Sequence, residues 1–152
     1  IGLPGTLSTI PQVYVDRLEA EFAADKRLLR AAAPELVEAA ERKLRGKPVD
    51  PAIYERAAAA LRQQPGGDRI DTVVLACTHF PLVEDELARA FGPDVRFVHG
   101  AQGIARRIAA LTAGQSFARS KPDLALFTRN EAQLAELAPA LQRHGLLEIE
   151  VF

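Results

Sequence analysis

The apolar positions of the chain follow two periods that alternate along the sequence. Short apolar runs typical of strands occur at 1–3, 27–30, 73–76, 95–98, 124–128 and 147–151. Helical spacing or helix-start signals occur between them, at 11–22, 34–44, 51–64, 81–91, 102–111 and 131–142. Strands that alternate with helices in this way predict an α/β fold whose parallel sheet is flanked by helices.

The predicted helix at 34–44 carries an acidic residue on its apolar side. Residues three and four apart are neighbours on a helix, so Val37, Ala40, Glu41 and Leu44 share one face. Glu41 therefore points with the apolar stripe. Two interpretations are open: Glu41 lies at the edge of the stripe with its carboxylate in water, or it serves a site.

The run at 73–76 leads directly into Cys77, the chain's only cysteine. Such a run predicts a strand that is covered on both faces in a parallel sheet. Pro81 is expected to open the next helix, where a missing N–H costs nothing. Cys77 would then lie at the carboxyl end of a strand, where open α/β sheets bind ligands, and beside a helix N-terminus, which favours a thiolate. The alternative is an inert buried thiol.

Composition narrows the function classes. A chain of 152 residues can bury a core of its own. The net charge of −1, spread without blocks, gives no reason to expect nucleic acid or an anionic membrane as a partner. No apolar run approaches the ~20 residues of a membrane span. One cysteine cannot form an internal disulfide, which fits a reducing cytosol. We expect no metal site, because no Cys/His cluster has ligand spacing, and no Lys lies in a context typical of a pyridoxal phosphate site.

Several segments resemble one enzyme family. Leu75-Ala-Cys-Thr-His-Phe-Pro81 closely resembles the second cysteine motif of glutamate racemases, Leu-Gly-Cys-Thr-His-Tyr/Phe-Pro. Ile1-Gly-Leu-Pro-Gly-Thr6-Leu-Ser-Thr9 is similar to the strand and Gly-Thr-x-x-Thr that open the family's second domain. Further likeness runs through Phe97-Val98-His99-Gly100, although His99 stands where an Asp is common in the family. The resemblance covers nearly the whole chain but only the C-terminal half to two-thirds of such an enzyme.

The resemblance implies a catalytic role for three residues. Cys77 would be one of two thiols that move the α-proton of glutamate without a cofactor. His79 would lie beside the thiol and assist it, because an imidazole can polarise a thiol or steady a substrate's charge. Glu41 aligns with a family glutamate that pairs with this histidine.

The resemblance also implies a set of substrate-binding residues. Thr78 would offer its backbone N–H and hydroxyl to a substrate carboxylate, together with His79. Thr6 and Thr9 follow the first strand, where family members place threonines near the substrate. Helix capping is the simpler interpretation of both threonines, and for Thr9 it is the better one.

We expect two parts in the chain. Residues 1–99 would form the second racemase lobe with the Cys77 motif, and residues 100–152 would belong to the first, otherwise missing lobe. The chain has no Met and opens on what resembles the end of a strand, so we expect a portion of a longer protein. The family's other cysteine motif, Cys-Asn-Thr, does not occur in it.

The function implied is a cytoplasmic isomerase that turns L-glutamate into D-glutamate for bacterial cell-wall peptidoglycan and thereby for cell shape. Its partners would be the small-molecule substrate and, as one option, a second copy in a homodimer. Residues 1–152 alone are expected to be inactive. Two alternatives stay open: an aspartate or hydantoin-type racemase of the same superfamily, and a non-catalytic truncated α/β module.

Overall fold

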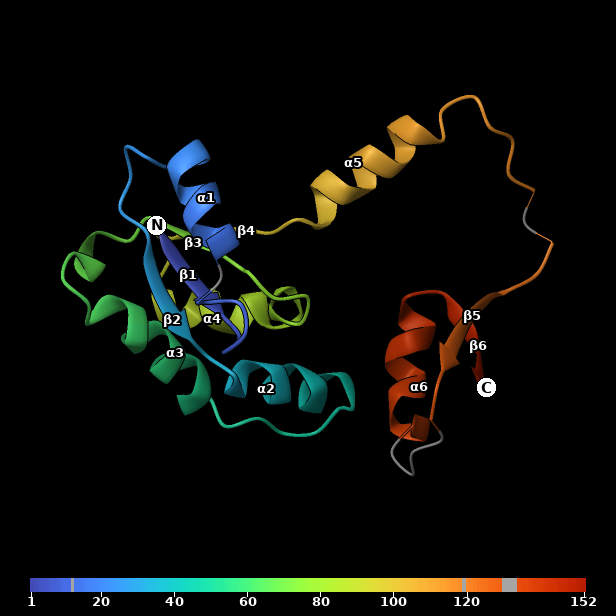
Figure 1. The fold of residues 1–152 in the computed structure, drawn as a ribbon. Coiled ribbons are helices and arrows are strands. Elements are labelled where there is room, and N and C mark those ends of the chain that lie inside the picture. Colours follow the sequence, from blue (N-terminus) through green and yellow to red (C-terminus); the bar gives the residue numbers. More distant parts are fainter. Residues whose placement is uncertain (12, 119, 130–133) are drawn as a thin grey trace.

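The computed structural model describes residues 1–11, 13–118, 120–129 and 134–152. Its main sheet has four parallel strands in the order β2-β1-β3-β4 (Figure 1). The strands are β1 (Gly2–Gly5), β2 (Leu29–Ala32), β3 (Thr72–Val74) and β4 (Arg96–Val98). The predicted α/β class with a parallel sheet flanked by helices is confirmed.

A proline limits the pairing in the middle of this sheet. β1 pairs with β2 over its whole length but with β3 only at Gly2 and Val73. Pro4 has no N–H to donate, so it contributes only its carbonyl, which accepts from the N–H of Ala76 at 3.4 Å. The chain after β3 is therefore held by single bonds rather than by a continuous ladder.

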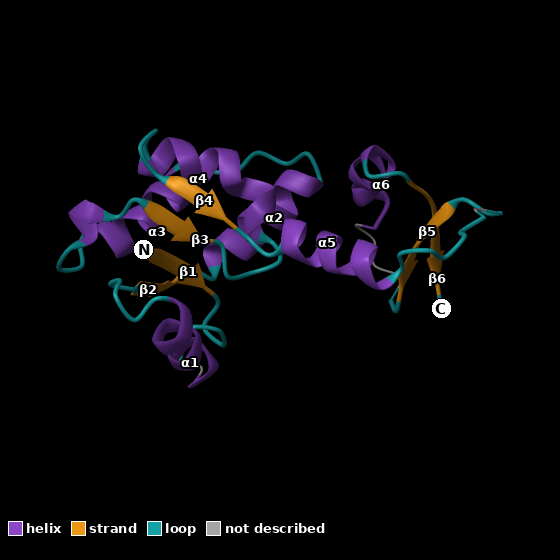
Figure 2. Ribbon diagram, turned by 90° about the horizontal axis from the view of Figure 1, so that it is seen from above, coloured by secondary structure: helices purple, strands orange, loops and turns teal. Residues whose placement is uncertain are grey.

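Helices cover the two faces of this sheet unequally (Figure 2). One face is packed by α2 (Glu35–Leu44), α3 (Ala52–Arg62) and α4 (Glu84–Phe91). Their apolar stripes meet the strands in one continuous core, whose largest fully buried members include Phe80, Leu36, Leu61 and Leu87. The other face carries α1 (Val13–Phe22) and has a groove that Leu3 and Val15 both line.

The segment after β3 differs from the prediction in two ways. The strand ends at Val74, although Leu75 still donates to the Val98 carbonyl at 2.9 Å. The α-helix expected from Pro81 begins at Glu84 and is preceded by a short 3₁₀ helix, η2, over Phe80–Val83. Residues three apart eclipse in a 3₁₀ turn, which lets Phe80 and Val83 enter the core together, both at 0% exposure. The helix that begins next to Cys77 is therefore the four-residue η2, which is too short to supply the helix dipole that was expected to favour a thiolate.

A second part of the molecule follows β4. Helix α5 (Ala101–Leu111) leads away from the main sheet, as Figure 1 shows, and none of its residues is buried. Beyond it, β5 (Asp123–Phe127) and β6 (Leu146–Val151) form a two-stranded parallel sheet, with α6 (Leu134–Arg143) between them in sequence. An ion pair of 2.6 Å joins Lys47, after α2, to Glu136 of α6. The assignment of residues 100–152 to another lobe stays a prediction.

Most predicted boundaries agree with the structure within about two residues. The strand expected at 27–30 lies at Leu29–Ala32, because Leu29 and Ala31 are the residues that point into the core. A short 3₁₀ helix, η1 (Gly67–Arg69), follows α3 and was not predicted. The helix expected at 11–22 is observed as α1, with residue 12 outside the described residues, and positions 130–133 before α6 lie outside them as well.

Candidate active site

The thiol of Cys77 lies in a hollow at the carboxyl ends of β3 and β4. This hollow has a volume of about 590 Å³. Residues 75–78 form one side and residues 99–101 another, with Tyr14 from α1 and Ile104 from α5 at the rim. Cys77 is partly exposed there, so it is not the fully buried thiol of the alternative interpretation. A small molecule could reach the sulfur from this side.

A line of side chains connects this thiol to α2. The Sγ atom of Cys77 lies 3.9 Å from Nδ1 of His79, and Nε2 of the same ring lies 2.9 Å from Oε1 of Glu41. An ionised carboxylate only accepts hydrogen bonds. Nε2 of His79 is therefore protonated, and its N–H donates a hydrogen bond to Glu41. In the neutral ring, Nδ1 then presents its lone pair to the thiol. This is the arrangement that a base needs to take up the thiol proton.

The electrostatics of Glu41 favour its ionised form. The hydrogen bond from Arg45 lowers the pKa of the Glu41 carboxyl, burial opposes this, and the hydrogen bond from His79 lowers the pKa further. The net pKa lies below the ordinary value. Glu41 is therefore a carboxylate at neutral pH and can hold the His79 ring in one tautomer.

The predicted apolar stripe of α2 was only partly right. The fully buried face consists of Leu36, Ala39 and Ala40. Glu41 lies at the edge of that face, with its side chain 36% exposed. The sequence left two interpretations open, a glutamate at the edge of the apolar stripe or a glutamate that serves a site. The structure agrees with both, because Glu41 lies at the edge of the buried face and also bonds to His79.

The predicted threonines are distributed over two places. Thr78 lines the hollow at Cys77, as its motif position suggested. Thr6 and Thr9 bond to each other through their hydroxyls at 2.8 Å, in the turn after β1, and Thr9 contributes to the groove beside α1. Neither of the two is among the described residues that line the hollow. Their role in substrate binding stays a prediction. In the structure, the bond between their hydroxyls stabilises the turn after β1.

Sequence reasoning gave no role to two side chains near the site: it noted His99 only as a departure from the family, and it did not single out Arg45. His99 lines the hollow; its Nδ1 accepts the N–H of Ala101 at the start of α5, and its Nε2 lies 3.8 Å from Glu84. Arg45 bonds to Glu41 from one turn further along α2. The second contact had a signal, because an acidic and a basic residue four apart on a helix are neighbours.

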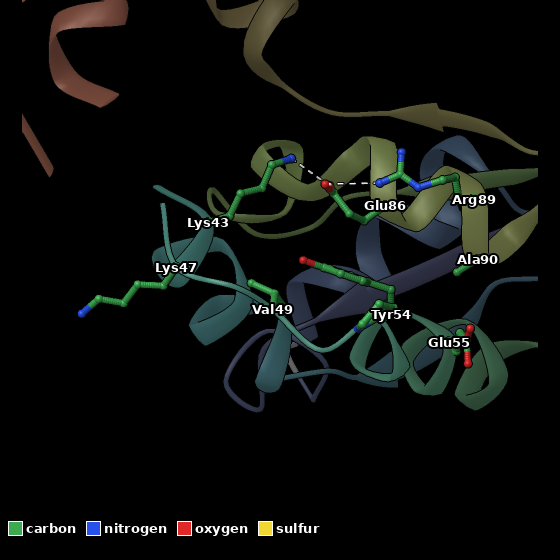
Figure 3. Close-up of a pocket in the computed structure, with 9 residues that line it drawn as sticks. Lys43, Lys47, Val49, Tyr54, Glu55, Glu86, Arg89 and Ala90 are labelled. Atoms are coloured by element: carbon green, nitrogen blue, oxygen red, sulfur yellow. Dashed lines mark hydrogen bonds and ion pairs between the residues drawn. The ribbon is translucent and has the colours of Figure 1, made fainter. Parts of the chain in front are cut away.

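A second cavity, of about 500 Å³, lies away from the thiol between α2, α3 and α4. Figure 3 shows its centre: Glu86 is bonded to Lys43 at 2.8 Å and to Arg89 at 3.4 Å. Burial raises the pKa of Glu86, but the hydrogen bonds and the charges of Lys43 and Arg89 together outweigh it, and the net pKa is lowered. Burial raises the pKa of Tyr54, whose ring crosses the cavity, while Lys47 points away from this group. Each of these three central charges is thus paired with a neighbour inside the cavity.

Two other kinds of site were considered. Across the described ranges, no group of three or more His, Cys, Asp or Glu side chains is placed to hold a metal ion. Of the helices described, none has the length and apolar character needed to cross a membrane.

Comparison with known proteins agrees with this geometry. The chain is 54% identical to a glutamate racemase of Sphingopyxis alaskensis. The alignment is 155 positions long and includes 99% of this chain. The chain is homologous to glutamate racemases. A glutamate racemase of Vibrio cholerae is 40% identical over 111 residues, which cover 73% of this chain and 40% of that protein. A scan against protein-family models found no match.

Solved racemase structures share the fold. The crystal structure of Escherichia coli glutamate racemase in complex with L-glutamate and the activator UDP-MurNAc-Ala superposes with a TM-score of 0.87 at 31% identity, covering 99% of this chain and 57% of that one. The glutamate racemase RacE1 of Bacillus anthracis, at 20% identity and a TM-score of 0.75, supports the fold alone. The chain spans about half the length of the curated relatives that match its full extent, for example 56% of the Sphingopyxis alaskensis racemase.

Proposed function

We propose that this chain contributes one of the two catalytic thiols of a cofactor-independent glutamate racemase, and that Cys77 is this thiol. The observation that carries the proposal is the line from Cys77 through His79 to Glu41, with contacts of 3.9 and 2.9 Å, at the strand ends of a racemase fold. A thiol beside an oriented imidazole in an open hollow can exchange a proton with a bound substrate.

The chemistry requires a group on each face of the α-carbon. In one direction, the Cys77 thiolate removes the α-proton, the electron pair of the C–H bond stays on the carbon, and a thiol on the opposite face supplies a proton. In the reverse direction the two sulfurs exchange roles. Because Cys77 is the only cysteine of the sequence, the second thiol has to come from outside residues 1–152.

The surroundings of Cys77 suit a small amino-acid substrate. Thr78 would bind the substrate carboxylate with its backbone N–H and hydroxyl, and His79 would assist the thiol. The Escherichia coli relative has been crystallised with L-glutamate, which supports glutamate as the substrate class. The product, D-glutamate, would enter bacterial peptidoglycan, and the site of action would be the cytoplasm. A homodimer is compatible with this function, and no observation favours it.

A graft tests the proposal. Residues 1–152 would replace the matching portion of the Sphingopyxis alaskensis racemase, and turnover of L- and D-glutamate would be followed by circular dichroism. We expect racemisation, and a loss of about 10²–10⁴-fold in kcat for Cys77→Ala, since one acid–base group typically contributes that much. His144→Gln, which changes a histidine after α6, is the matched control and should stay near the parent rate.

The same graft separates the alternatives. Faster turnover of aspartate or of a hydantoin than of glutamate would replace the substrate assignment. A folded graft that turns over none of these substrates, or one whose activity survives Cys77→Ala, would contradict the proposal and leave the non-catalytic module.

A further inference from the structure

Arg45 is one of the most enclosed charged side chains near the proposed site. Its side chain is 16% exposed. Its Nη1 atom donates to the backbone carbonyl of Glu41 at 3.0 Å and also to the Oε2 atom of the Glu41 carboxylate. Two bonds from one nitrogen fix the arginine against a single residue, one helical turn away. Such a clamp restricts the rotation of the glutamate side chain.

The two oxygens of Glu41 are thereby divided between two partners. Oε2 faces Arg45, and Oε1 faces Nε2 of His79 at 2.9 Å. A carboxylate that is held on one oxygen can present the other in a defined direction, as bidentate and charge-assisted contacts do elsewhere. The direction matters here because the opposite edge of the same imidazole faces Cys77.

The second part of the molecule helps to enclose the arginine. Arg45 shares a cavity of about 170 Å³ with Phe127 and Thr128 at the end of β5 and with Leu137 of α6. Arg129 lines the same cavity and is another charged group that faces it. An exposed Glu–Arg pair on a helix is screened by water and contributes little. Residues from β5 and α6 reduce that screening for Arg45.

We propose that Arg45 is a positioning residue, which clamps the Glu41 carboxylate so that His79 keeps its Nε2–H tautomer and its Nδ1 lone pair toward Cys77. The part played by Cys77 rests on the proposed function, whereas the clamp itself does not. A substitution at Arg45 should therefore change the chemistry of His79 and of the thiol without touching either residue.

The competing explanation is purely structural: the arginine would only close the last turn of α2. The two explanations differ in what they change. A helix-end contact affects the free energy of unfolding alone. A clamp sets the tautomer of His79 and the reactivity of Cys77 in the folded protein.

The chain of 152 residues is well suited to this test. It contains three histidines and one cysteine, so the imidazole signals can be resolved and a thiol reagent reports on Cys77 alone. The tautomer of His79 would be measured by long-range ¹H–¹⁵N correlation NMR. The thiol would be followed by its rate of alkylation with iodoacetamide between pH 6 and pH 9.

We expect Arg45→Gln to mix the two tautomers of His79. An imidazole that presents its lone pair to the thiol less often should also slow alkylation at neutral pH by about threefold to tenfold, since a shift of one unit in a thiol pKa changes the thiolate fraction about tenfold. Arg45→Lys, which keeps the charge, should restore part of both properties. Arg42→Gln is the matched control, because Arg42 bonds to the Pro48 carbonyl from the same helix and should leave both properties unchanged.

A double substitution removes the remaining ambiguity. If Arg45 acts through Glu41, then Arg45→Gln should add nothing to the effect of Glu41→Gln on the thiol. Additive effects, or an unchanged His79 tautomer in folded Arg45→Gln protein, would overturn the clamp. An inactive racemase graft would contradict the proposed function only, because the tautomer of His79 is measured without turnover.

Discussion

The part of the molecule around the main sheet, residues 2–98, and the part that follows it, residues 101–151, bury their apolar side chains to very different extents. In the first part, a continuous core runs from Leu29 to Val95 and includes residues at 0% exposure. In the second part, Ala125 and Ala140 are the buried apolar residues among those described. Both parts nevertheless consist of regular helices and strands, and the strands of each sheet are parallel.

Helix α5 illustrates the difference. Ile104, Ile108 and Leu111 are 62%, 57% and 62% exposed, and their spacing places them on one face of the helix. In β5, Leu126 is 54% exposed. Large exposed apolar patches are places where further protein commonly packs. The local pattern thus specifies the elements of the second part but not their burial, and we expect further protein surface to cover these apolar side chains.

The strongest test of this comparison is catalytic. If the second part needs the rest of a racemase, the 152-residue chain alone should show no racemisation of glutamate under conditions where the graft turns over, because one α-carbon face lacks its thiol. Deuterium incorporation and enantiomer ratio in D₂O would be measured together. Robust racemisation by a clean preparation of the chain would break the argument, as would a dimer that brings two copies of Cys77 to one substrate.

Paired substitutions test the comparison through stability. Leu61→Ala removes a side chain with 0% exposure from the first part, and such changes cost about 2–5 kcal/mol. Ile108→Ala trims a side chain that is 57% exposed on α5, so the cost should stay within about 0.5 kcal/mol, as for other surface changes. Urea denaturation would measure both, and sedimentation would show less self-association for Ile108→Ala. Equal costs would mean that α5 is packed as tightly as α3.

The sequence predicted the elements of both parts well, because period and turn residues are local signals. It placed the start of the helix after Cys77 wrongly, since Pro81 is compatible with either helix type and the choice of a 3₁₀ turn depends on where Phe80 and Val83 fit in the core. The inward phase of Glu41 could be read from helical spacing. Its contact with His79 joins residues 38 positions apart, so helical spacing could not show it and only the resemblance implied it.

The same limit applies to the residues that complete the hollow. Thr78 and Cys77 were predicted because one motif contains both. Tyr14, His99 and Ile104 reach the hollow from three other segments, and no local pattern announces that these segments meet. The resemblance implies that Thr6 and Thr9 lie near a substrate, which stays a prediction; the structure shows their hydroxyls bonded to each other in the turn after β1.

The smallest expected effect concerns the ion pair that joins the two parts. Lys47 and Glu136 are 2.6 Å apart, with side chains 37% and 38% exposed. Exposed pairs contribute about 0.2–1 kcal/mol and weaken in salt. Lys47→Ala should therefore leave the free energy of unfolding nearly unchanged, while hydrogen exchange of the α6 amides rises by about fivefold or less. At about 1 M salt, where the Debye length is about 3 Å, variant and parent should converge.

Lys26→Ala is the control for this last prediction, because it removes an exposed ion pair, with Asp25, that lies wholly within the first part. It should leave exchange in α6 at the parent rate. Much faster exchange in α6 for Lys47→Ala, at low and high salt alike, would mean that the lysine contributes more than its charge. The second part would then depend on the first for its order, and the cavity that Arg45 shares with residues of β5 and α6 would be expected to open in the same variant.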